Sequence, residues 1–261
     1  MRCMVMLGFL VALCTSLFAE STRPCLRACV VYESPECPAV TCYKNDAHRI
    51  KAALSSIAHS LRIPLRLEMR AHKTLSPSAL NQWIRSVSSN DIAVVFYAGT
   101  GRCREQKNGM WPVMTIPAHE GCTLAYGEDE VASQIASRNP RLSLILFDCY
   151  SHLTTRRQSH SVGLSKKVRL SRNCLGIRKL FLQSRGTVTA CSAQRGMPSY
   201  GVVAKKTSGG VFTSRFLHLL QKDQSSLTSW EVFCSHLKHV ACQNLPSLQS
   251  PDAVVVSAKR M

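Results

Sequence analysis

The stretch that decides the fold is DIAVVFYAGTGRC, residues 91–103. Residues 92–97 form an unbroken apolar run of strand-favouring side chains, which predicts a strand buried on both faces of a parallel sheet. A glycine-bracketed turn, Ala98-Gly99-Thr100-Gly101, follows and presents a single polar side chain. In open α/β sheets the functional site lies at the carboxyl ends of the central strands. We therefore expect this turn to border the site.

A second strand of the same kind is predicted over residues 141–148, and it ends in Asp148-Cys149-Tyr150-Ser151-His152. These two strands are the most apolar in the chain. Central strands of a covered sheet are buried on both faces, so we expect the two to be neighbours. Their polar ends would then meet at one edge of the sheet.

Strand and helix patterns alternate along the rest of the chain, which predicts a mostly parallel sheet covered on both faces. Ser76 and Pro77 have the residue types of a helix cap and a first helical position. The other elements follow from apolar spacing. Strands are predicted at 28–32, 65–69, 91–97, 141–148, 186–192 and 251–257, and helices at 45–61, from 76, 127–137, 211–221 and 230–240.

The first residues have the pattern of a secretory signal peptide. Met1-Arg2 gives a positive start, residues 3–18 are almost wholly apolar, and Ala19 is a small residue at a plausible cleavage point. A transmembrane anchor is the alternative, but the run is slightly short for a full span. We expect export to the periplasm or the cell exterior, with residues 1–19 removed.

Cysteine is abundant, with thirteen in the chain, of which Cys3 and Cys14 would leave with the signal. In an exported protein the default interpretation is disulfides. A cluster of four cysteines near the mature start could cross-link that segment through disulfides. It could also bind zinc, although the cysteine spacing favours this less. The cluster consists of Cys25, Cys29, Cys37 and Cys42. We predict no metal site and no cofactor.

The net charge of +18 favours an acidic partner such as nucleic acid, anionic lipid or an acidic protein. No Asp or Glu occurs from Cys149 to Lys222. Residues 156–185 could bind an anionic polymer or membrane, although a solvated loop is the simpler interpretation. No aromatic side chain lies among these basic residues until Phe181, so specific nucleic-acid recognition is not expected.

Six short motifs, in order, resemble those of the caspase-like cysteine peptidases, especially the metacaspases. The resemblance covers about residues 27–256. It implies a three-layer sandwich around a mostly parallel, six-stranded sheet. The motifs are Asn45-Asp46-Ala47, Tyr97-Ala98-Gly99-Thr100-Gly101, Asp148-Cys149-Tyr150-Ser151-His152, Thr189-Ala190-Cys191-Ser192-Ala193-Gln194, Gly209-Gly210-Val211-Phe212-Thr213-Ser214 and Gln249-Ser250-Pro251.

The chain departs from the family pattern at the two positions of the catalytic dyad. The position of the family's catalytic histidine is Thr100, and the position of its nucleophilic cysteine is Tyr150. Threonine cannot take a proton at neutral pH, and a phenol with a pKa of about 10 stays protonated. The double loss predicts an inactive pseudoprotease. The alternative is an active endopeptidase with Cys149 as nucleophile and His152 as base.

The resemblance also implies a first specificity pocket for arginine or lysine. Its acidic residues correspond to Asp46 and Asp148, and Ser192 corresponds to its wall. A carboxylate pair can hold one guanidinium by two hydrogen bonds. The simpler interpretations are a helix charge for Asp46 and a local ion pair for Asp148.

These observations predict an exported caspase-like protein that binds a basic peptide or partner, with cleavage after Arg or Lys, or cationic surface binding, as alternatives. The expected division is a signal peptide at 1–19, a Cys/Pro-rich start with the first strand at 20–43, a large-subunit-like part at 44–152, a basic inter-subunit-like loop at 153–185 and a small-subunit-like part at 186–261.

Overall fold

The computed structural model describes most of the chain beyond the predicted signal peptide, which lies outside the described residues. No helix in this part is long and apolar enough to cross a membrane. The described residues are 23–33, 40–99, 102–106, 109–117, 123–149, 152–154, 175–192, 200–202, 209–222, 227–242 and 252–260.

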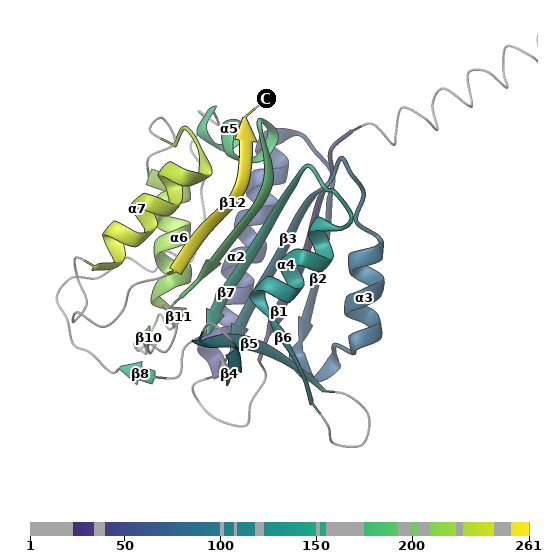
Figure 1. Cartoon of the computed structure of the whole chain (residues 1–261). Coiled ribbons are helices and arrows are strands. Elements are labelled where there is room, and N and C mark those ends of the chain that lie inside the picture. The colour runs from purple at the N-terminus through teal and green to yellow at the C-terminus, as the bar shows by residue number, and fades with distance from the viewer. Residues whose placement is uncertain are drawn as a thin grey trace, which may run out of the picture.

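A six-stranded sheet forms the centre of the molecule (Figure 1). Five strands run parallel, and the last pairs antiparallel with its neighbour at one edge. The predicted mostly parallel α/β sheet is confirmed. In spatial order the strands are β12 (Asp252–Arg260), β9 (Ser184–Cys191), β7 (Leu142–Cys149), β3 (Ile92–Gly99), β1 (Leu26–Tyr32) and β2 (Leu65–Ala71).

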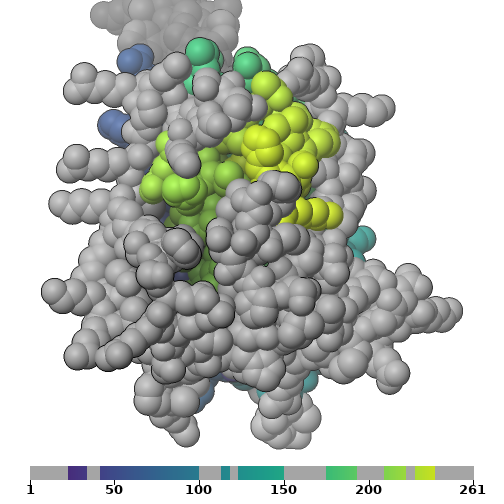
Figure 2. Space-filling view, turned by 90° about the vertical axis from the view of Figure 1, so that its left-hand side faces the viewer, coloured from purple at the N-terminus to yellow at the C-terminus, as the bar shows by residue number. Residues whose placement is uncertain are grey.

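Helices cover both faces of this sheet, which makes three layers (Figure 1). One face carries α2 (Val40–Leu61), α5 (Leu175–Leu182), α6 (Val211–Lys222) and α7 (Trp230–Cys242). The other face carries α3 (Pro77–Arg85) and α4 (Glu128–Ala136). Figure 2 shows α6 in green beside α7 in yellow on one side of the molecule.

Strand β3 is buried along its whole length because the helical layers cover both of its faces. Alternate side chains enter opposite cores, as the two-residue period of a strand requires. Val94 and Phe96 pack beneath α2 and α6, whereas Val95 and Tyr97 pack beneath α3 and α4. The apolar run at residues 92–97 thus supplies both cores at once.

The helix ends follow the expected local chemistry. The Ser76 hydroxyl accepts a hydrogen bond from the Ala79 backbone N–H at 3.1 Å and so caps α3, with Pro77 in the first position. Trp230, at the start of α7, is fully buried and donates its indole N–H to the Leu180 carbonyl at 2.8 Å. This bond ties α7 to the end of α5.

Two small sheets and several short elements were not predicted from the sequence. They lie in segments that lack a long apolar pattern. One sheet comprises β4 (Arg102–Gln106), β5 (Gly109–Pro117) and β6 (Thr123–Gly127), and the other comprises β8 (His152–Thr154), β10 (Tyr200–Val202) and β11 (Gly209–Gly210); the 3-10 helix η1 (His72–Thr74) and helix α5 were also missed.

The structure describes three of the four cysteines of the expected disulfide staple, and none of these three forms a disulfide. Cys25, Cys29 and Cys42 are buried free thiols, and Cys37 lies outside the described residues. Cys29 packs in the core beneath α3 and α4, whereas Cys42 packs in the core on the opposite face of the sheet. The two thiols therefore lie in separate cores rather than in one staple.

Candidate functional site

The two strands expected to frame the site are neighbours. β3 and β7 pair in parallel, with Ala98 opposite Asp148 and Gly99 opposite Cys149. Their carboxyl ends therefore meet at one edge of the sheet, as predicted. Thr100 and Tyr150, at the two positions where the family resemblance places the dyad, lie outside the described residues.

Cys149 is buried rather than presented at the edge. Its exposed fraction is 7%, and it packs in the core beneath α3 and α4 with Tyr97 and Phe147. Burial raises the pKa of its thiol well above the usual value, and the neighbouring Cys191 and Asp148 raise it further. The thiol is therefore protonated at neutral pH. His152 is the first residue of β8, and its side chain lies outside the described residues.

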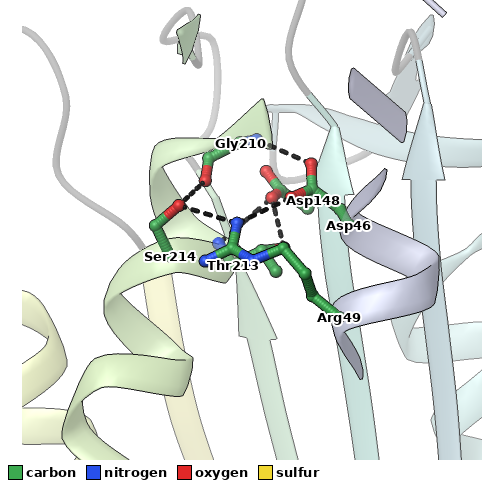
Figure 3. Close-up of polar contacts among 6 residues, drawn as sticks. All are labelled: Asp46, Arg49, Asp148, Gly210, Thr213 and Ser214. Atoms are coloured by element: carbon green, nitrogen blue, oxygen red, sulfur yellow. Dashed lines mark hydrogen bonds and ion pairs between the residues drawn. The ribbon is translucent and has the colours of Figure 1, made fainter. Parts of the chain in front are cut away.

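Asp46 and Asp148, predicted to bind substrate, meet near the amino end of α6 (Figure 3). Asp46 comes from α2 and Asp148 from the end of β7, and both side chains are fully buried. The Asp46 Oδ2 accepts from the Gly210 backbone N–H at 2.6 Å. The Asp148 Oδ2 accepts from the Thr213 backbone N–H at 3.1 Å and from its hydroxyl at 2.6 Å.

Two glycines allow the carboxylates to approach the backbone. A Cβ atom at Gly210 would lie 1.9 Å from Asp148 Oδ2, and one at Gly209 would lie 2.5 Å from Asp46 Oδ1. Both distances are far below van der Waals contact. The amino end of a helix carries partial positive charge and unpaired N–H groups, so it suits two acidic side chains.

Arg49 places a guanidinium beside the same pair (Figure 3). Its Nη1 donates to Asp46 Oδ1 at 3.2 Å and to the Ser214 hydroxyl at 3.0 Å, and Ser214 donates in turn to the Gly210 carbonyl at 2.8 Å. The charge of Arg49 also lowers the pKa of Asp148. The sequence analysis missed Arg49, although its spacing of three residues from Asp46 on a helix is a detectable signal.

The carboxyl groups of Asp46 and Asp148 both have a raised pKa. Burial, and then the charge of Asp148, raises the pKa of Asp46 well above its usual range. Burial raises the pKa of Asp148 to about 6, opposed mainly by its two hydrogen bonds from Thr213. Two buried carboxylates with one guanidinium between α2 and α6 therefore form an acidic site that favours a further proton or cation.

Ser192 lies with the acidic pair, so the three predicted substrate residues are brought together. It is fully buried, and its hydroxyl donates to the Cys149 carbonyl at 3.1 Å. It also lies close enough to Asp148 to lower the pKa of that carboxyl. The described residues contain no cluster of three or more side chains suited to a metal ion.

Comparison with known proteins identifies the fold. No family model and no curated protein matches the chain. Among solved structures, the crystal structure of caspase-1 from Spodoptera frugiperda is 10% identical, with a TM-score of 0.53, and the match covers 90% of this chain and 87% of that one. The structure of pro-sf-caspase-1 is 11% identical, with a TM-score of 0.51 and coverage of 89% and 91%. At this identity the similarity establishes a caspase-like fold and nothing more.

Proposed function

We propose that this chain is an exported, metacaspase-type protein that has lost peptidase chemistry and binds a basic segment of a partner protein at Asp46 and Asp148. The observation that carries the proposal is the state of Cys149. It is the one cysteine next to the expected nucleophile position, and it is buried with a strongly raised thiol pKa.

A cysteine nucleophile must reach its substrate as a thiolate, held beside a base. Reactive cysteines are partly exposed and have a lowered pKa, whereas the Cys149 thiol is enclosed by apolar side chains and has a raised pKa. The sequence places threonine and tyrosine at the two positions where the family has its dyad. These features together argue against cleavage with Cys149 as a relocated nucleophile.

The acidic pair has the composition that recognition of a basic side chain requires. Two neighbouring carboxylates can together hold a guanidinium, which remains charged in proteins. Arg49 already supplies such a group to Asp46. We propose that an arginine or lysine of the partner takes the place of Arg49, since Arg49 retains some exposure at 12% of its side chain. Arg49 would then compete with the ligand.

The proposal is tested by calorimetric titration with two peptides that differ only in a central Arg or Glu. We expect binding of the Arg peptide alone. Asp46→Asn with Asp148→Asn should abolish it, whereas Asp129→Asn with Glu231→Gln, two exposed positions that together remove the same charge, should not. Arg49→Met should tighten binding because it removes the competing guanidinium. Equal binding of both peptides, or an unchanged affinity in the Asp46/Asp148 variant with a native melting profile, would refute the proposal.

A further inference from the structure

The solvent-facing side of α2 carries a row of basic side chains that the carboxylate site does not use. The exposed residues recur at helical spacing along this side, over about 27 Å of axis at 1.5 Å per residue. Arg62 directly follows the last turn of α2. We call this surface the α2 basic face; it consists of Lys44, His48, Lys51, His59 and Arg62.

Acidic side chains do not offset this charge in the described part of the surrounding layer. α2, α5, α6 and α7 contain two acidic residues, Asp46 and Glu231. Asp46 is fully buried, so Glu231, on α7, is the exposed one. Among the described residues, the ion pairs involve none of the α2 basic face.

The adjacent edge strand β2 does not place its acidic side chain, Glu68, on this surface. Leu67 and Met69 of β2 pack with the core beneath α2, so alternate residues of this strand point to the other face of the sheet. Glu68 is one of these, and it pairs with Arg70 at 2.8 Å. The opposite helical layer carries more acidic side chains, because α4 begins with Glu128, Asp129 and Glu130, although Glu128 is buried and the exposed Arg85 lies on α3. Among the described helices, basic charge is therefore least offset in the layer of α2.

We propose that the α2 basic face binds a linear anionic polysaccharide. A helix that binds a membrane surface places large apolar side chains beside its cations, and the exposed large hydrophobic residues of the described part, Leu124 and Leu175, belong to β6 and α5 rather than to α2. Single-stranded nucleic acid is bound by stacking on exposed aromatic rings, and the one aromatic residue of α2, Tyr43, is buried. A row of basic side chains without either feature can select a polyanion only by the spacing of its charges.

Export, which the first nineteen residues predict, favours a polysaccharide over DNA as the polyanion that this protein meets. The surface lies on residues that contribute nothing to the carboxylate site. The inference is therefore independent of the proposed peptide binding, and either can fail alone.

The test is binding of the full mature chain to heparin, a sulfated polysaccharide, at a series of salt concentrations. Lys44→Gln, Lys51→Gln and Arg62→Gln are combined in one variant. By analogy with DNA, where each neutralised contact contributes about 0.9 to the slope of log affinity against log salt, we expect this slope to fall by about 2 to 3. Affinity at physiological salt should fall at least about tenfold.

A matched control removes three exposed arginines elsewhere: Arg23→Gln, Arg85→Gln and Arg185→Gln. It has the same net charge as the α2 variant, and we expect less than a threefold loss of affinity for heparin. Equal losses in both variants would overturn the proposal, since binding would then follow net charge. Both variants should melt like the wild type because all six side chains are exposed.

Two further probes distinguish the partner. Duplex DNA and vesicles containing phosphatidylglycerol are titrated at the same salt concentrations as heparin. Weaker binding of both than of heparin supports the assignment. Tighter binding of either, with the same dependence on Lys44, Lys51 and Arg62, would overturn the choice of a polysaccharide. The Asp46/Asp148 variant should bind heparin like the wild type.

Discussion

Substitution of Gly210 by alanine should disrupt the joint between β7 and α6. The added Cβ would lie 1.9 Å from Asp148 Oδ2, about 1.5 Å closer than the 3.4 Å at which ordinary contact begins. A carboxylate displaced by that amount cannot keep both its 2.6 Å and its 3.1 Å hydrogen bond from Thr213, so one of the two is lost. Overpacking costs about 1–3 kcal/mol, and each lost bond to a charged group about 1.5–3 kcal/mol.

We therefore expect Gly210→Ala to lower the free energy of unfolding by about 3–6 kcal/mol, measured by urea denaturation. The melting temperature should fall by roughly 10–20 °C, since 1 kcal/mol corresponds to about 2–4 °C in a chain of this size. The clash involves one partner, so a double-mutant cycle isolates it. In an Asp148→Ala background the same glycine substitution should cost less than about 1 kcal/mol. An equal cost in both backgrounds would refute the assigned contact.

Three other changes test the fold and the site. Asp148, with a pKa of about 6 in the folded protein against 3.8 in the unfolded chain, should lower the free energy of unfolding by about 2–3 kcal/mol as the pH rises from about 4 to 7, and Asp46, whose pKa is also raised, should add to this fall; a chemical denaturation series that is equally steep in Asp148→Asn would contradict this. Trp230→Phe should lower the free energy of unfolding by about 1–3 kcal/mol, since it leaves the buried Leu180 carbonyl without its hydrogen-bond donor. An unchanged urea midpoint would show that this bond does not stabilise α7. Cys149 should resist iodoacetamide in the native protein and react in urea, as read by peptide mass spectrometry, and rapid native labelling would contradict its burial.

The central sheet could be predicted because its signal is local. Residues 92–97 and 141–148 are apolar on both faces, and only a covered parallel sheet buries such runs, so β3 and β7 were placed as neighbours with their polar ends together. Gly209-Gly210 likewise indicated the start of α6. In each case the pattern over a few residues is enough to specify the element.

Features that depend on tertiary contacts escaped the sequence analysis. β4 to β6 form their own small sheet, and their pairing is set by partners rather than by an apolar run. The spacing of Cys29 and Cys42 gave no sign that they would pack on opposite faces of the sheet. Arg49 was missed because its role depends on Ser214, which is 165 residues away in the chain.

The pair of Asp46 and Asp148 includes one feature that could be predicted from the sequence and one that could not. The resemblance to the caspase-like peptidases implied that Asp46 and Asp148 share one pocket, and in the structure both contact the amino end of α6. Their complete burial against the helix end was not predictable, because it depends on how closely Gly209 and Gly210 approach. A motif can thus specify which side chains meet without specifying their access to solvent.

The central claim is that a caspase-like frame persists here without peptide-bond chemistry. Its most direct test is incubation of the purified wild-type chain with a peptide library rich in arginine and lysine, with products read by mass spectrometry. We predict no cleavage above the level of a Cys149→Ala variant. Cleavage after basic residues that Cys149→Ala abolishes and Tyr150→Phe leaves intact would contradict the account.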